Sequence, residues 1–198
     1  APAREIPFIR WPELEPVGLY GGAWPHAGLQ TKFLRAEPTD QVEPLPAGRW
    51  RPAGSGIELE LIETPGHALD QVAIAVDGVL LAADGLFKPE VIAKHPIIFL
   101  VNVAEYLSSL ERLATRSERW ILPGHGALID RGTGGEDPLP AILAENRAAI
   151  ARIQEAILTA LKESLSLEEL LYQVVEALGK RLASEPQYFL DRAAISAH

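Results

Sequence analysis

Residues 57–87 constrain the fold of this 198-residue chain more than any other segment. Apolar side chains recur with a period of about two in residues 57–62 and again in 72–76, which predicts two β-strands. Asp77-Gly78 is a strong signal for a two-residue hairpin turn. Residues 79–83 form a short apolar run of the kind found in buried strands. The segment therefore predicts three strands joined by tight turns.

Three side chains that can bind metal ions stand directly after predicted strands, each beside a glycine. His67 follows Pro65-Gly66, and Asp84 follows the third strand. His125 follows a further short strand, residues 120–122, in the sequence Pro-Gly-His-Gly. Glycine allows sharp backbone turns, so these imidazoles can point over the edge of the sheet. Loops at the rim of a rigid sheet are where chemistry usually occurs.

Imidazole and carboxylate are ligands that zinc, iron and manganese take in proteins, and one carboxylate can bridge two ions about 3.5–4 Å apart. Taken singly, each residue has an ordinary structural interpretation, because a histidine after a strand is more often a hydrogen-bonded surface residue than a ligand. The repeated Pro-Gly-His sequence favours a shared site. We therefore assign His67, Asp84 and His125 as metal ligands and not as catalytic acids or bases.

An irregular stretch precedes these strands. Residues 1–56 contain many prolines and glycines, which forbid a long helix and leave room for short strands such as residues 30–34. Residues 88–101 read as a connection, with residues 97–101 extended. Between the third and fourth strands, apolar residues at helical spacing predict a helix from about Val103 to Arg116, capped by Asn102.

The last part of the chain is predicted to be helical. A long apolar stripe predicts a helix over residues 140–163, and Ser166 with Glu169 forms a capping box that opens a second helix at 167–178. Glu185-Pro186 starts a third helix. Strands that alternate with helices are typical of an α/β core. We therefore expect a domain over residues 1–138 and a C-terminal helical extension over residues 139–198.

The composition excludes several classes of function. The chain has no cysteine, so it has no disulfide, thiolate ligand or cysteine nucleophile. It has no apolar run long enough to span a membrane and no signal peptide pattern, so the cytoplasm is the default expectation. A net charge of −9 without a basic run argues against nucleic acid as a partner. A small-molecule substrate is the expected partner, and a homo-oligomer is left open.

The motifs together resemble a known family. TPGHALDQVAIAVDGVLLAADGLF followed by WILPGHG is similar to the second half of the metallo-β-lactamase fold hydrolases, in the glyoxalase II-like branch that carries a C-terminal helical extension. The resemblance covers roughly residues 57–182, and three ordered motifs agree. It implies an α/β fold: the second half of a metallo-β-lactamase-like αββα sandwich, with the first half missing or reduced.

The resemblance also implies a function. Members of the family hydrolyse an ester, thioester, lactone or similar bond through a metal-bound hydroxide, with zinc, or iron or manganese, in a site of two ions. His67 would belong to the first metal site, His125 to the second, and Asp84 would bridge them. Asp70 either orients a metal-bound imidazole from behind or caps the turn in which it lies.

One departure from the family leaves the activity of this chain open. The family signature His-x-His-x-Asp-His is absent, and His26 is the only histidine that precedes His67. The chain is then either a C-terminal fragment of a longer protein, which the irregular start favours, or a natural member without the motif. A metal-dependent hydrolase is the first hypothesis, and a non-catalytic scaffold or interaction module with a decayed metal site is the alternative.

Overall fold

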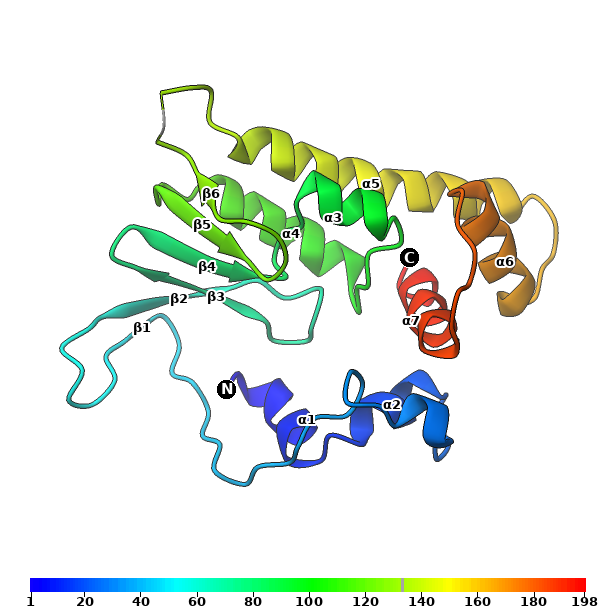
Figure 1. Ribbon diagram of the computed structural model, residues 1–198, viewed down its shortest axis with the longest axis horizontal. Coiled ribbons are helices and arrows are strands. Elements are labelled where there is room, and N and C mark those ends of the chain that lie inside the picture. Colours follow the sequence, from blue (N-terminus) through cyan, green and yellow to red (C-terminus); the bar gives the residue numbers. More distant parts are fainter. Residues whose placement is uncertain (133) are drawn as a thin grey trace. The chain divides into compact units, whose positions relative to one another are not determined.

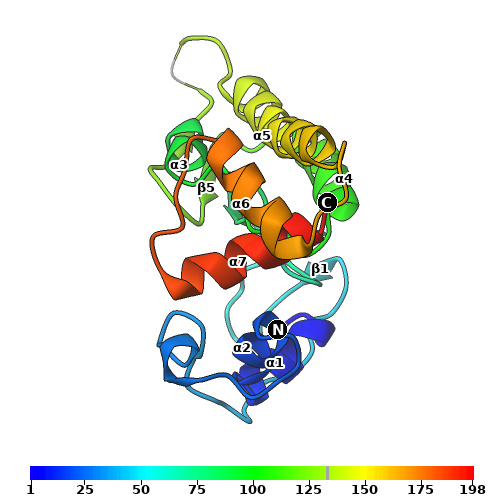
Figure 2. The same ribbon diagram turned by 90° about the vertical axis from the view of Figure 1, so that its right-hand side faces the viewer.

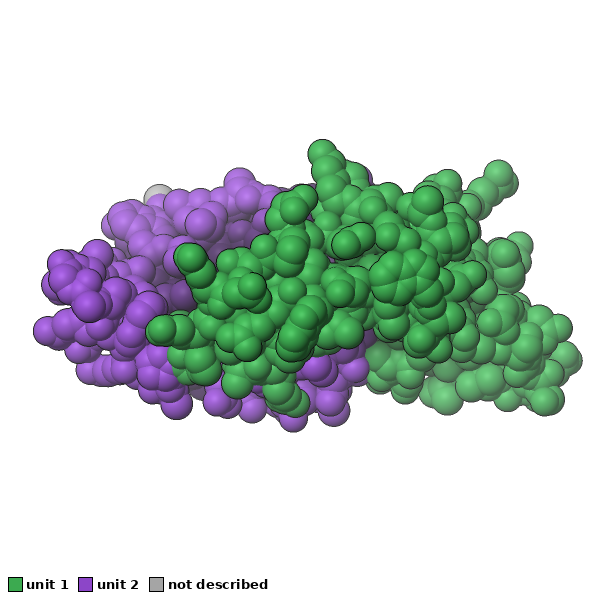
Figure 3. Space-filling model, turned by 90° about the horizontal axis from the view of Figure 1, so that it is seen from below, with its two compact units in different colours: residues 1–45, 152–198 green, residues 46–151 purple. Residues whose placement is uncertain are grey.

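The structure is a computed structural model that describes residues 1–132 and 134–198. The polar loop predicted around residue 133 lies partly outside the described residues. The chain divides into two compact units, one of residues 46–151 and one of residues 1–45 with 152–198 (Figure 3). The two units divide the chain within helix α5 (Leu139–Ala160), between residues 151 and 152. The predicted domain boundary between residues 138 and 139 stays a prediction.

The strands of residues 46–151, which are unit 2 in Figure 3, form one mixed sheet, drawn in Figure 1. In the described residues it has six strands in the order β1 to β6. Their bounds are β1 Arg49–Trp50, β2 Leu59–Glu63, β3 Val72–Val76, β4 Val79–Ala83, β5 Trp120–Pro123 and β6 Ile129–Asp130. The tight turn predicted at Asp77-Gly78 is confirmed, and both residues have positive φ, as a hairpin of this kind requires.

The pairing of these strands places three strand ends at one edge of the sheet. β2 and β4 each pair antiparallel with β3, so they run in the same direction. β4 pairs parallel with β5, in the register Leu80 to Ile121. A parallel pair needs a long crossover, and here it contains helices α3 (Pro89–Lys94) and α4 (Val103–Ala114). The segments that follow β2, β4 and β5 therefore emerge at the same edge.

Helices cover one face of this sheet. Every second side chain of the central strands points into the core and is buried: Ala73, Ala75, Leu80, Ala82 and Ile121. Helix α4 and the first half of α5 add the buried side chains Tyr106, Leu110, Leu113, Leu143 and Ile150 to the same core. Figure 1 shows α4 and α5 running beside the sheet. Asn102 caps α4 by accepting a hydrogen bond from the Glu105 amide at 3.1 Å, as predicted.

The other face of the sheet keeps apolar side chains partly exposed. The register aligns Ile74, Leu81 and Leu122 across three strands, and paired residues share a face. The exposed fractions are 36% for Leu81 and 42% for Leu122, although both are central strand residues. We call these three residues the open apolar row.

In the other unit, residues 1–45 with 152–198 (unit 1 in Figure 3), the regular elements are helices. They are α1 (Ile6–Arg10), α2 (Leu14–Leu19), the end of α5, α6 (Leu167–Ala177) and α7 (Glu185–Ser196), with short 3₁₀ turns at Ala3–Glu5 and Ala27–Leu29. The predicted capping box is present: Ser166 Oγ accepts from the Glu169 amide, and the Glu169 carboxylate accepts from the Ser166 amide. Figure 2 shows α7 crossing beside α6, with which it packs.

One sequence expectation about local structure is wrong, because residues 30–34 form a turn instead of a strand. Residues 97–101 belong to the connection, as expected, and they do not join the sheet. The N-terminal prolines stop long helices but permit short ones, because Pro7 occupies the first turn of α1, where its missing N–H costs no hydrogen bond. Helix α3 was missed inside the predicted connection, and it also begins with a proline, Pro89.

Gly66 fixes the distance between the end of β2 and helix α4. Its φ is +130°, and a β-carbon placed there would lie 2.5 Å from the backbone of Tyr106. Its carbonyl oxygen accepts hydrogen bonds from the amides of Val101 and Asn102, at the start of α4. Ser109 of α4 also donates to the carbonyl of Pro65 at 2.8 Å. The loop that holds His67 is thus pressed directly onto the helix.

We expect Gly66→Ala to reduce the free energy of unfolding by about 3 kcal/mol or more, because it adds an overlap with Tyr106 to the strain of a positive φ. Gly78→Ala is the matched control, since Gly78 also has positive φ but has open space around it. That control should cost about 1 kcal/mol. Urea denaturation measures both, and equal losses would contradict the contact.

A second prediction concerns Asp191 of α7, which is 6% exposed and accepts a hydrogen bond from Gln187 Nε2 at 2.6 Å. Burial raises the pKa of this carboxyl from 3.8 to about 6. Below about pH 4 the carboxyl is protonated in both the folded and the unfolded chain, and its burial costs the folded state no charge. The folded state loses stability as the pH rises through 6, because the buried carboxyl must then ionise. We expect Asp191→Asn to raise the melting temperature at about pH 7.5 and to change it little at about pH 4. Thermal melts that shift equally at both pH values would contradict this assignment.

Candidate metal centre

The three candidate ligands converge at the edge where β2, β4 and β5 end. His67 Nε2 lies 3.6 Å from Asp84 Oδ2, and His125 Nε2 lies 3.7 Å from Asp84 Oδ1. One carboxylate thus faces two imidazoles, one on each of its oxygen atoms. The sequence placed each residue after a strand, and the common direction of the three strands brings them together.

The His67 ring is held on several sides. Its Nδ1 lies 2.9 Å from the carbonyl oxygen of Phe99. A carbonyl only accepts hydrogen bonds, so Nδ1 carries the proton and donates it. The imidazole also packs edge-to-face against the rings of Phe87 and Phe99, with centroids 5.9 and 5.7 Å away. In the neutral ring, the lone pair of Nε2 is then left pointing toward Asp84.

Backbone geometry at two residues sets the position of Asp84. Ala83 has a φ of +46°, which few residues other than glycine adopt, and it lies at an irregularity in the β4–β5 pairing. Gly124 passes so close that a β-carbon there would lie 2.5 Å from Asp84 Oδ1. The Gly124 amide donates to the Ala83 carbonyl at 2.7 Å. The end of β5 is therefore packed against the carboxylate.

The chemistry of these atoms fits a bound cation. Asp84 Oδ1 is buried and has no hydrogen-bond partner, which is costly for a carboxylate oxygen. The two nitrogen-to-oxygen separations exceed hydrogen-bond length. Two ligands of one tetrahedral zinc stand about 3.3–3.6 Å apart, given metal–ligand distances of about 2.0–2.2 Å. The observed separations are close to this range. A metal ion between each imidazole nitrogen and the facing Asp84 oxygen would therefore turn two facing acceptors into two ligands.

Each half of this centre is incomplete within the described residues. No group of three or more histidine, aspartate or glutamate side chains there is arranged around a single ion. His67 and Asp84 are about one-quarter exposed, whereas the His125 side chain is 66% exposed. Two protein ligands per ion make a weak, open site, because zinc sites in enzymes usually have three. The assignment of these residues as ligands stays a prediction.

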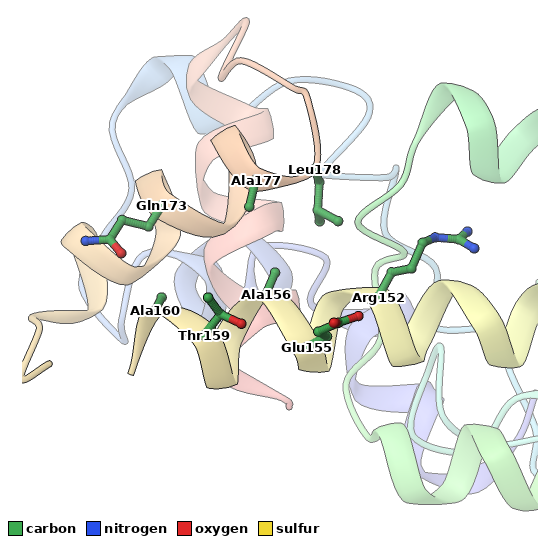
Figure 4. Close-up of a pocket in the computed structure, with 8 residues that line it drawn as sticks. All are labelled: Arg152, Glu155, Ala156, Thr159, Ala160, Gln173, Ala177 and Leu178. Carbon is green, nitrogen blue, oxygen red and sulfur yellow. The ribbon is translucent and has the colours of Figure 1, made fainter. Parts of the chain in front are cut away.

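Other candidate residues lie outside this pair of contacts. Asp70 belongs to the loop that carries His67, and its role as an orienting residue stays a prediction. His26, the only histidine upstream of His67, belongs to the unit of residues 1–45 and 152–198, where its Nε2 lies 2.9 Å from Glu185 Oε1. A groove of about 430 Å³ between α5 and α6 is lined by Arg152, Glu155, Ala156, Thr159, Ala160, Gln173, Ala177 and Leu178 (Figure 4). None of the three candidate ligands lines that groove.

Sequence reasoning missed the residues behind the centre. Phe87, Tyr106 and Asn146 form a buried hydrogen-bonded and aromatic cluster next to His67. The available signal was the place of Asn146 on the apolar stripe of the predicted helix, four residues from both Ile142 and Ile150, because a buried amide needs partners. The sequence could not say which partners it has.

Two curated proteins share sequence with part of the chain, although no protein-family model matches it. The lactamase-like protein vrtG of Penicillium aethiopicum is 28% identical over 104 residues, which are 52% of this chain and 32% of that protein. The beta-lactamase-like protein 2 homolog of Drosophila melanogaster is 30% identical over 80 residues, which are 40% of this chain and 25% of that protein. The chain thus matches about a third or less of the length of these relatives.

Solved structures extend the similarity over nearly the whole chain. A metallo-β-lactamase family protein from Thermus thermophilus superposes with a TM-score of 0.67 at 23% identity, over 98% of this chain and 63% of that one. A beta-lactamase domain protein from Burkholderia ambifaria gives a TM-score of 0.60 at 21% identity, over 86% of this chain and 49% of that one. The predicted fold class is confirmed: this chain has the metallo-β-lactamase fold.

Proposed function

We propose that this chain carries half of the active site of a metal-dependent hydrolase, with two metal ions held on either side of Asp84. His67 and Asp84 would hold one ion, and His125 and Asp84 the other. Zinc is the first choice, and iron or manganese would suit the same ligands. The proposal rests on one observation above all: each oxygen of a single carboxylate faces a different imidazole, at 3.6 and 3.7 Å.

The chain's own residues have defined tasks in this proposal. Bound ions would supply Lewis acidity and an activated water molecule at neutral pH. Asp84 would supply negative charge to both ions. The Phe99 carbonyl keeps the proton of His67 on Nδ1, so that Nε2 remains available as a ligand. The exposed position of His125 leaves one side of the centre accessible to a substrate.

Further ligands are needed to complete the centre. The solved structures of this fold are longer than the part that the chain matches, since it covers 63% and 49% of them. The open apolar row offers a surface on which a second sheet can pack, as sheets do at a distance of about 10 Å. We infer that a second sheet on this face brings additional imidazole or carboxylate ligands to the same edge.

An ester, thioester or lactone is the substrate class that we propose, by analogy with the glyoxalase II-like branch whose motifs the sequence resembles. The chemistry proposed for the centre, a Lewis acid beside an activated water, suits an activated carbonyl group. The net charge of −9 disfavours a polyanionic nucleic acid. No helix of the described residues is long and apolar enough to cross a membrane.

Metal binding by the chain tests this proposal first. We expect the purified chain to bind zinc weakly, and Asp84→Asn, His67→Ala and His125→Ala each to raise the dissociation constant by about tenfold or more. His95→Ala is the matched control, because it removes an exposed imidazole at the end of α3 that we do not assign to the centre. Isothermal titration and elemental analysis measure the effect. Equal zinc binding by all four variants would contradict the ligand assignment.

Hydrolysis tests the function itself. A protein that joins this chain to the ligand-bearing sheet is expected to hydrolyse thioesters or lactones, to lose activity with a chelator and to regain it with zinc. Asp84→Asn in that protein should abolish turnover, because it weakens the binding of both metal ions at once. Full zinc occupancy without turnover on any of these substrates would favour the alternative, a non-catalytic module.

A further inference from the structure

A buried amide on helix α5 connects the segments that carry two of the candidate ligands. Asn146 is fully buried, and its side chain makes four hydrogen bonds. Its Nδ2 donates to the carbonyls of Phe87 at 2.7 Å and Ile142 at 2.8 Å. Its Oδ1 accepts from the Phe87 amide at 2.9 Å and from the Tyr106 hydroxyl at 2.8 Å. All the hydrogen-bonding capacity of this amide is therefore used.

Phe87 transmits this restraint toward both ligands. It lies three residues after Asp84, and Asn146 binds both its amide and its carbonyl, so the backbone beyond Asp84 is held by one side chain. The Phe87 ring then packs edge-to-face against the His67 imidazole at 5.9 Å. A displacement of Phe87 would move the end of the Asp84 turn and remove one wall of the His67 ring.

Tyr106 is the second route from Asn146 to His67. Its ring lies 6.3 Å from that of Phe87, and its backbone lies against Gly66, the residue before His67. Burial and, to a smaller extent, the charge of Asp84 raise the pKa of the Tyr106 hydroxyl far above its usual value. The phenol therefore stays protonated, and it remains a donor to Asn146.

We propose that Asn146 is a positioning residue, which orients the His67 imidazole and the Asp84 turn through Phe87 and Tyr106. Its importance for metal binding rests on the proposed function, whereas its effect on the His67 ring does not. A side chain that only filled space could be replaced by leucine, which has the same branching and number of side-chain heavy atoms, without changing the His67 ring. A positioning amide could not, because leucine binds neither Phe87 nor Tyr106.

The test compares three variants of the whole chain. Asn146→Leu removes all four hydrogen bonds, and Tyr106→Phe removes only the one from the hydroxyl. Ile150→Ala is the control for general loss of stability, because Ile150 is a buried apolar residue one turn further along α5. Nitrogen-15 NMR of the histidine rings at mildly alkaline pH shows which nitrogen of His67 carries the proton, and zinc titration gives the affinity.

In the wild-type chain, His67 should hold its proton on Nδ1. Asn146→Leu should give a mixture of tautomers and raise the zinc dissociation constant by about tenfold or more, Tyr106→Phe should give a smaller change of the same kind, and Ile150→Ala should leave the ring unchanged. An unchanged His67 ring in folded Asn146→Leu overturns the inference. If that variant does not fold, an unchanged ring in Tyr106→Phe overturns it. A wild-type chain that binds no zinc defeats the proposed function alone, because the NMR comparison is made without metal.

Discussion

The common direction of β2, β4 and β5 is the constraint on which the candidate centre depends. Their C-terminal ends share one edge only because β3 returns the chain between β2 and β4, and because a helical crossover allows β5 to pair parallel with β4. Residues far apart in sequence thus reach one place without any long loop. Gly66 and Gly124 then allow the backbone to approach Tyr106 and Asp84 more closely than any other residue could.

The atoms at the candidate centre are electrostatically unfavourable unless a cation binds between them. A carboxylate oxygen that is buried without a partner, and an imidazole lone pair that faces another acceptor, are both unfavourable in a protein that contains nothing else there. A divalent cation converts both into favourable contacts. The strained backbone at Ala83 belongs to the same pattern, because unfavourable local geometry persists where the surrounding structure holds it in place, often at functional sites.

Much of the sheet and the outline of the centre could be predicted from the sequence. Alternation in β2 and β3, the Asp77-Gly78 turn and the caps at Asn102 and Ser166 are local signals with local causes, and they are confirmed. The short N-terminal helices and α3 were not predicted, since proline can begin a helix as well as prevent one. The cluster of Phe87, Tyr106 and Asn146 depends on how α4 and α5 pack in three dimensions, and no local pattern encodes it.

The open apolar row has a consequence for the behaviour of the chain in solution. Ile74, Leu81 and Leu122 sit side by side on one sheet surface, and two of them are at least about one-third exposed. A contiguous apolar strip of this kind carries a driving force for self-association and aggregation that rises with concentration. A layer that covers the open apolar row would therefore suppress self-association of the sheet, in addition to supplying ligands to the proposed centre.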